Sequence, residues 1–229
     1  MSETSANLRR KMDTARDLQS VVTTMKAVAA SSLGQYERAT HALSDYHRTV
    51  QLGLMACLRD IEHAPAPEAS QRHPSEPSIA VVFGSDHGLV GSFNDVMADF
   101  VLKTIGHSSK NTVVWTVGER LRTRLVESKL SLGKSFTLAG SIGAITPLVG
   151  QVLVEIEAQS AKGVFTQVDV FHHSPQTGAV CRPTRHRLLP LDEAWRQACL
   201  QAPWPTQNLP EVMNGVQATL RAFVREYLF

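Results

Sequence analysis

One apolar stripe runs unbroken from Leu8 to Ile61, and it limits what the chain can fold into more than any other feature. Its members recur at steps of three and four with a mean of ~3.5 residues, which is the heptad period of a coiled coil. No proline interrupts the stretch, and Gly34 is its only glycine before Gly53. The stripe consists of Leu8, Met12, Ala15, Leu18, Val22, Met25, Ala29, Leu33, Tyr36, Ala39, Leu43, Tyr46, Val50, Leu54, Cys57 and Ile61.

This pattern predicts one continuous helix of roughly 80 Å. Such a helix is far longer than the usual three turns of a helix in a globular protein. Because a helix cannot bury a stripe against itself, the stripe needs a partner. The sequence therefore predicts a long shaft with other elements attached.

The composition argues against several classes of protein, including nucleic-acid-binding, disulfide-rich and membrane-spanning proteins. The chain has 229 residues, 43% of them hydrophobic, and a formal net charge of +2. Near-neutral charge argues against nucleic-acid binding through a broad basic face. The 3 cysteines are scattered and fit no disulfide framework or metal spacing, which favours a reducing cytosolic compartment. The polar start resembles no signal peptide, and no apolar run reaches the ~20 residues that span a bilayer.

Changes in periodicity divide the chain into four predicted segments. Residues 1–61 form the coiled-coil helix, and residues 62–77 form an extended linker because four prolines exclude a helix. Residues 78–191 alternate strand-like and helix-like patterns, which predicts a small α/β sheet with right-handed crossovers. Residues 192–229 form a connector and the start of a second amphipathic helix.

Within the α/β segment, short apolar runs predict strands and amphipathic runs predict helices. The predicted strands are 79–83, 112–117, a weaker 135–138, and 168–171, with a β-ribbon from 179 to 189. Three helices are predicted in this segment. The first has Ser92 as its N-cap, the second begins after Gly118, and the third begins with Pro147 in its first turn. The second amphipathic helix is predicted to begin at Leu209.

The glycine-rich turn from Gly84 to Ser92 is the motif that most resembles a ligand-binding site. A strand, a glycine-rich turn and a helix can offer backbone amides to a phosphate. However, its G-x-x-x-G-x-x-G spacing matches neither the dinucleotide fingerprint nor a P-loop, and no lysine follows. A tight turn that lets helix and strand pack closely is the favoured interpretation, and phosphate binding is the alternative.

Other candidate sites have weaker patterns. The adjacent pair Asp86-His87 has no matched nucleophile for acid/base chemistry. His172, His173, Cys181 and His186 fit no zinc spacing, and a β-turn after His173 is favoured over a metal site. The basic group around Arg185 is interpreted as a solvated face, with an acidic partner or phosphate as the alternative. The α/β segment contains no tyrosine, which excludes a Tyr/Lys dehydrogenase site there.

Three motifs resemble the gamma subunit of F-type ATP synthases, in the same order along the chain. Residues 21–31, VVTTMKAVAAS, resemble that family's I-T-x-A-M-x-M-V-A-A-S-K signature. Residues 85–94, SDHGLVGSFN, resemble its S-D-R-G-L-C-G-x-x-N turn, and residues 183–191 resemble its P-x-x-x-x-L-L-P-L exit from the domain. Asp17, Ser32, His87 and Val90 depart from the pattern, which suggests a divergent branch such as an alternative bacterial ion-pumping ATPase.

The resemblance implies an α/β protein whose long N- and C-terminal helices form an antiparallel coiled coil around an inserted, small Rossmann-like α/β domain. It implies a non-catalytic rotor shaft with no cofactor, no metal and no nucleic acid. The implied partners are the alpha and beta catalytic subunits, an epsilon-type subunit and the membrane c-ring. The chain would lie on the cytoplasmic face of a bacterial inner membrane without inserting into it. The implied subunit-interface residues are Met25, Lys26, Ala29, Ala30, Ser31, Asp86, His87, Gly88 and Gly91.

Two other function classes stay open from sequence alone. One is a nucleotide-binding enzyme that uses the Gly84–Ser92 turn, and the other is a free-standing coiled-coil adaptor with an α/β head. The family's second helix continues well past the point where this sequence stops, so the resemblance also predicts a truncated or short C-terminal helix.

Overall fold

The structure is a computed structural model that describes residues 4–60, 77–106, 111–176, 181–191, 193–201, 203–208, 210–213 and 215–229. The chain divides into two compact units, Met1–Thr49 and Val50–Phe229. Helix α1, Ser5–Asp60, contributes to both units. The predicted linker, 62–77, lies almost wholly outside the described residues.

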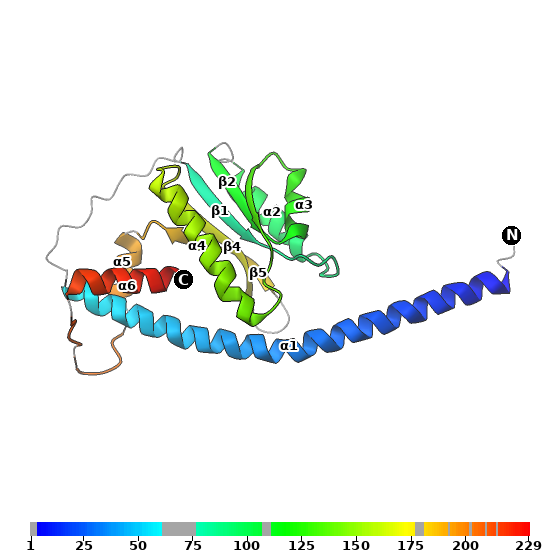
Figure 1. Cartoon of the computed structure of the whole chain (residues 1–229), viewed down its shortest axis with the longest axis horizontal. Coiled ribbons are helices and arrows are strands. Elements are labelled where there is room, and N and C mark those ends of the chain that lie inside the picture. The colour runs from blue at the N-terminus through cyan, green and yellow to red at the C-terminus, as the bar shows by residue number, and fades with distance from the viewer. Residues whose placement is uncertain are drawn as a thin grey trace. The chain divides into compact units, whose positions relative to one another are not determined.

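The first unit consists of the larger part of α1, a helix of 56 residues in total (Figure 1). The long helix predicted from the stripe is confirmed. None of the described residues before Val50 is buried. The stripe side chains of this unit are exposed, as Leu18 at 61% and Leu43 at 64% illustrate.

The second unit is built around a 5-stranded sheet of order β3-β2-β1-β4-β5 (Figure 1). Strands β1 (Ser78–Phe83), β2 (Thr112–Val117), β3 (Ser131–Phe136) and β4 (Gln167–Pro175) are parallel where they pair. Strand β5 (Cys181–Leu189) pairs antiparallel with β4, which confirms the predicted ribbon. The mixed α/β class is therefore as predicted.

Helices cover both faces of this sheet. Helices α2 (Phe93–Ile105) and α3 (Glu119–Val126) pack on one face, over a core that includes Val82, Val114 and Phe171. Helix α4 (Ile145–Ala161) packs on the other face, over Val81 and Trp115. Because β1 and β2 are buried on both faces, their residues are almost continuously apolar, as expected for central parallel strands.

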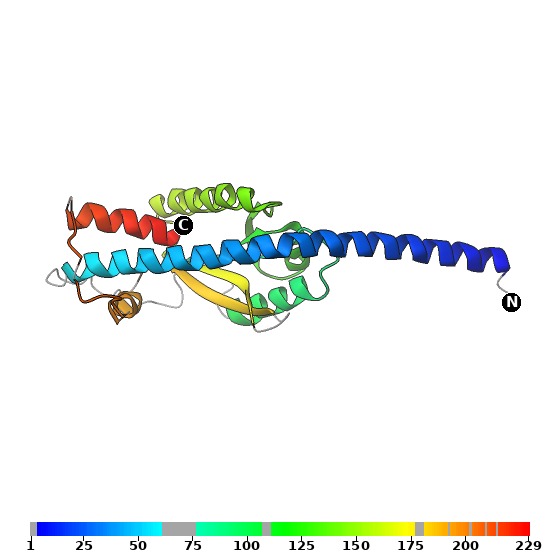
Figure 2. The same ribbon diagram turned by 90° about the horizontal axis from the view of Figure 1, so that it is seen from below.

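The last turns of α1 belong to the second unit because their apolar side chains are buried there. The buried residues are Val50, Leu54, Met55, Cys57 and Leu58. Helix α6 (Val216–Leu228) runs beside these turns in the opposite direction, as Figures 1 and 2 show. The two helices approach closely, since a Cβ atom at Gly53 would lie 2.3 Å from the ring of Phe223.

Three predicted bounds in the α/β segment are wrong. The fourth strand does not end at residue 171 before a β-turn at His173, because pairing with β5 extends β4 to Pro175. The third strand occupies 131–136 instead of 135–138, because pairing with the buried strand β2 recruits a polar stretch with no strand pattern of its own. Helix α4 begins at Ile145 after a short 3-10 turn, Ile142–Ala144, so Pro147 lies in its first turn but does not start it. Ser92 is the N-cap residue of α2, but its side chain makes no capping hydrogen bond.

The C-terminal region differs more from prediction. Helix α6 begins at Val216, not at Leu209, and Gly215 directly before it adopts a φ of 91°, which lies outside the right-handed helical region. A further helix, α5 (Glu193–Gln201), precedes it and was not predicted. None of the described helices is long and apolar enough to cross a membrane.

Candidate functional site

The Gly84–Ser92 turn is held by hydrogen bonds between its own residues and α2. The backbone N–H of Ser85 donates to Oδ1 of Asn94 at 3.0 Å, and Nδ2 of Asn94 donates to Oγ of Ser85 at 2.8 Å. The same hydroxyl donates to the carbonyl oxygen of His87 at 2.9 Å. Ser85 and Asn94 are both buried, so this network fixes the start of the turn.

Asp86 ties three segments of the sheet edge together. Its Oδ1 accepts the backbone N–H of Glu119 at 2.7 Å, at the beginning of α3. Its Oδ2 accepts the backbone N–H of Leu138 at 3.0 Å, just after β3. The carboxylate therefore occupies the N-terminus of α3, where an anion would otherwise be stabilised. The part played by Asp86 is structural, and no described contact pairs it with His87 for acid/base chemistry.

Two glycines allow the ends of β1 and β2 to come close. A Cβ atom at Gly84 would lie 2.3 Å from Cβ of Leu121. Gly118 has a φ of 113°, and a Cβ there would lie 2.9 Å from the backbone nitrogen of Ser85. These contacts support the packing interpretation of the glycine-rich turn over the phosphate-binding one.

The tip of the turn faces solvent. His87, Gly88 and Gly91 are exposed, and Leu89 is 76% exposed. Gly91 has a φ of 59°, which glycine adopts without strain. The turn thus presents a short exposed tip on a base fixed by Ser85 and Asp86, a shape suited to a protein contact.

The histidine and cysteine group does not form a metal site in the part of the chain that the structure describes. Nε2 of His173 lies 3.0 Å from the carbonyl oxygen of Phe93, and the two rings stack with centroids 3.9 Å apart. Cys181 is exposed on the edge strand β5. Burial raises the pKa of the other two thiols, Cys57 and Cys199, so both are poor nucleophiles.

Basic residues of β5 are partly neutralised within the sheet. Nη2 of Arg185 lies 2.8 Å from Oδ2 of the buried Asp169, and Nε of Arg187 lies 3.8 Å from its Oδ1. The basic group therefore serves first to balance a buried carboxylate, which reduces its availability for an external anion.

The predicted interface residues on α1 lie on one solvent-exposed stretch. Met25 is 44% exposed, and Lys26, Ala29, Ala30 and Ser31 are also exposed. The hydroxyl of Ser31 donates to the carbonyl oxygen of Val28 at 2.9 Å, so its hydrogen-bond donor is already satisfied within the helix. This stretch is a slim, weakly charged helix surface with no feature of an active site.

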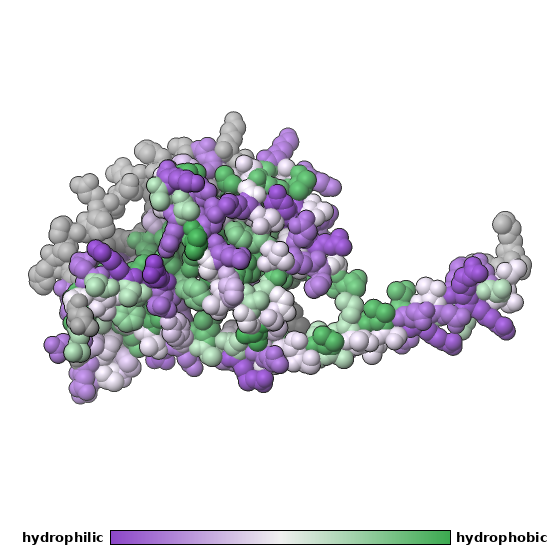
Figure 3. Space-filling view, in the orientation of Figure 1, coloured by the Kyte–Doolittle hydropathy of each residue, from purple (hydrophilic) through white to green (hydrophobic). Residues whose placement is uncertain are grey.

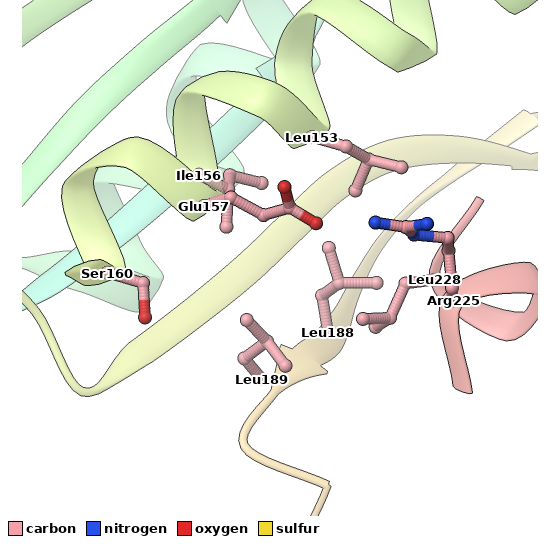
Figure 4. Close-up of a pocket in the computed structure, with 8 residues that line it drawn as sticks. All are labelled: Leu153, Ile156, Glu157, Ser160, Leu188, Leu189, Arg225 and Leu228. Carbon is pink, nitrogen blue, oxygen red and sulfur yellow. The ribbon is translucent and has the colours of Figure 1, made fainter. Parts of the chain in front are cut away.

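A cavity of about 200 Å³ lies between α4, β5 and α6 (Figure 4). Leu153, Ile156, Leu188 and Leu228 make it mainly apolar, and Figure 4 shows the charged groups of Glu157 and Arg225 pointing toward one another across it. Its walls come from segments far apart in the sequence, so no sequence pattern could have predicted it. Apart from Arg225, the only side chains with polar groups among its lining residues are Glu157 and Ser160, both on α4.

Comparison with known proteins identifies the family. The family model described as ATP synthase matches residues 4–229. The ATP synthase gamma chain of Desulfitobacterium hafniense is 24% identical over 190 residues, which cover 82% of this chain and 66% of the relative. The gamma chain of Oenococcus oeni is 25% identical over 181 residues, which cover 73% of this chain and 57% of the relative.

Solved structures show the same fold. The chain aligns with a TM-score of 0.59 and 18% identity to the Tetrahymena thermophila mitochondrial ATP synthase central stalk and c-ring structure, covering 91% of this chain and 87% of that one. It aligns with a TM-score of 0.58 and 14% identity to the Euglena gracilis mitochondrial ATP synthase rotor, covering 83% of this chain and 64% of that one.

The chain spans between 57% and 67% of the length of the curated relatives it matches. Those relatives carry the same name, ATP synthase gamma chain, and the family match extends over nearly all of this chain. The motifs at residues 21–31 and 85–94 lie within the matched range. This chain therefore belongs to the gamma-chain family of ATP synthases.

Proposed function

We propose that the chain is the central rotor-shaft subunit of a rotary ATP synthase and is not itself catalytic. The observation that carries this proposal is the helix of 56 residues with an exposed apolar stripe, in a chain that matches the ATP synthase family from residue 4 to residue 229. In this function, rotation of the shaft couples ion flow through the membrane sector to ATP synthesis or hydrolysis in the surrounding subunits.

The shaft itself would be an antiparallel coiled coil. The packing of α6 against the last turns of α1 supports this, because Gly53 and Phe223 already meet at the base of such a pair. The α/β unit would be the Rossmann-like foot of the shaft. Its central strand order and its helices on both faces support that assignment.

The proposed contact with the catalytic subunits is the segment Met25–Ser31. Its members Ala29, Ala30 and Ser31 have small side chains, which keep the helix slim where a collar of catalytic subunits would close around it. Lys26 is the only charged residue between Leu18 and Tyr36, so this surface is smooth as well as narrow. These properties suit a surface that turns inside a ring.

The proposed contact of the foot is the tip of the Gly84–Ser92 turn. His87 and Gly88 would touch a neighbouring subunit, while Asp86 and Gly91 hold the turn in the shape that presents them. The partners proposed for the foot are an epsilon-type subunit and the membrane c-ring. The alpha and beta subunits are the partners proposed for the shaft, on the cytoplasmic face of a bacterial inner membrane.

Co-assembly with the alpha and beta subunits from the same organism tests this function. We expect the full chain to co-purify with them and the complex to need the chain for sustained ATP turnover. Ala30→Arg should leave the isolated chain folded but slow turnover, because added volume and charge would meet the ring. Ala158→Arg, at an exposed alanine of α4, is the matched control.

Two outcomes would overturn the proposal. Failure of the chain to associate with alpha and beta subunits would favour a free-standing adaptor. If ATP turnover is equal in both arginine variants and in the unaltered chain, residues 25–31 do not contact the ring of catalytic subunits.

A further inference from the structure

Large apolar side chains recur on the exposed surface of α1 from Leu8 to Tyr46. Figure 3 shows apolar side chains recurring along this exposed helix. The large exposed side chains of the first unit are Leu8, Met12, Leu18, Val21, Val22, Met25, Val28, Leu33, Tyr36, Leu43 and Tyr46. The same stripe becomes buried from Val50 onward, where Gly53 lies against Phe223. A face that is buried at one end and apolar throughout is built to be covered.

The spacing of this stripe is nearly symmetric about Ala29, with Leu18 and Ala39 one residue out of step. Val22 and Tyr36 lie equally far from Ala29 on either side, and so do Met25 and Leu33. Ala15 and Leu43 form another such pair, as do Met12 and Tyr46. When a second copy of the helix is laid antiparallel across Ala29, apolar side chains therefore meet apolar side chains at each of these steps.

The side-chain sizes also suit this antiparallel pairing. Ala15 meets Leu43, so a small side chain faces a large one, and Ala29 meets its own copy at the centre. Lys26 is the only charged residue from Leu18 to Tyr36, so no like charges repel across the middle of the pair. Both properties are what a two-fold, self-complementary interface requires.

We propose that the unassembled chain forms a two-fold antiparallel dimer through residues 12–46 of α1, centred on Ala29. The pairing overlaps about 50 Å of helix. It covers most of the part of the stripe that the described residues leave exposed, and it must separate if the shaft is to enter a complex. The proposal goes beyond the rotor function and does not rest on it, because it concerns the isolated chain alone.

The molar mass of the purified full chain in solution tests the interface. We expect a concentration-dependent dimer by light scattering and sedimentation. Val22→Glu puts a charge into the seam twice per dimer and should raise the dimer dissociation constant by about 100-fold or more. Thr23→Glu, the neighbour on the outer face, should leave the dissociation constant nearly unchanged. Circular dichroism establishes that both variants keep their helix content.

A monomer at all concentrations would overturn the proposal. So would a dimer that Val22→Glu and Thr23→Glu affect equally, because its interface would lie elsewhere.

Thiol cross-linking tests the direction and register of the pair. In a Cys181→Ser background, the remaining natural thiols, Cys57 and Cys199, are buried. With a short bis-maleimide, Ala29→Cys should link to its own copy. Val22→Cys should not link to itself but should link to Tyr36→Cys when the two proteins are mixed. Efficient self-linking of Val22→Cys would indicate a parallel pair and overturn the antiparallel assignment.

Discussion

At the scale of single residues, two glycines of α1 have opposite surroundings. A Cβ atom at Gly34 would touch only the end of the Arg38 side chain, at 3.7 Å. A Cβ atom at Gly53 would lie 2.3 Å from the Phe223 ring. We expect Gly34→Ala to stabilise the helix by about 0.5–1 kcal/mol, since glycine costs that much in an exposed helix interior. Gly53→Ala should instead destabilise the second unit, because the ring must move away.

Chemical unfolding followed by circular dichroism measures both changes. The two variants are controls for each other, because both add the same methyl group to the same helix. Equal effects in the two variants would mean that the Gly53–Phe223 contact does not hold α6 in place.

Asp86 provides the second test at this scale. Its two oxygens accept the backbone N–H groups of Glu119 and Leu138, and both donors lose their partner in Asp86→Ala. We expect a loss of about 1–3 kcal/mol in the free energy of unfolding. The neighbouring His87→Ala should change it by less than about 0.5 kcal/mol, because His87 is exposed. If Asp86→Ala leaves the free energy of unfolding unchanged, the carboxylate does not join the three segments.

At the scale of elements, the backbone amides at the junction of β1 and the glycine-rich turn already donate within the fold, since Gly84 N–H donates to the carbonyl oxygen of Val117. The Ser85 amide donates to Asn94, and the Asp86 carboxylate already occupies the N-terminus of α3. We therefore expect isothermal titration with ATP, ADP and NAD to give no saturable heat. A dissociation constant in the micromolar range would revive the nucleotide-binding enzyme that the sequence left open.

At the scale of the whole molecule, the two units should differ in local stability. The first unit has no buried residue among those described, whereas β1 and β2 are buried on both faces. In the Val22→Glu variant, we expect the backbone amides of residues 5–49 to exchange with solvent much faster than those of β1 and β2. Hydrogen exchange read by mass spectrometry measures this. Uniform protection of α1 in a strict monomer would contradict both this expectation and the proposed dimer.

Local sequence patterns are enough to predict the elements whose signal lies in neighbouring residues. The heptad steps from Leu8 to Ile61 predict α1 to within a few residues of its observed ends, Ser5 and Asp60. Strand β2 has the predicted bounds, 112–117, because a buried central strand is apolar on both faces. The motifs at residues 21–31 and 85–94 indicate the family on their own, because each is a contiguous run of residues.

Features that depend on residues far apart in the sequence could be seen only in the folded chain. Strand β3 is polar and exists because β2 offers it a hydrogen-bonding edge. The role of Asp86 depends on amides at Glu119 and Leu138, which no local pattern connects to it. Burial of the stripe begins at Val50, close to where Gly53 meets Phe223 of α6, although the stripe looks the same on both sides of that point. Periodicity says which face of a helix must be covered, but only packing says where a cover is present.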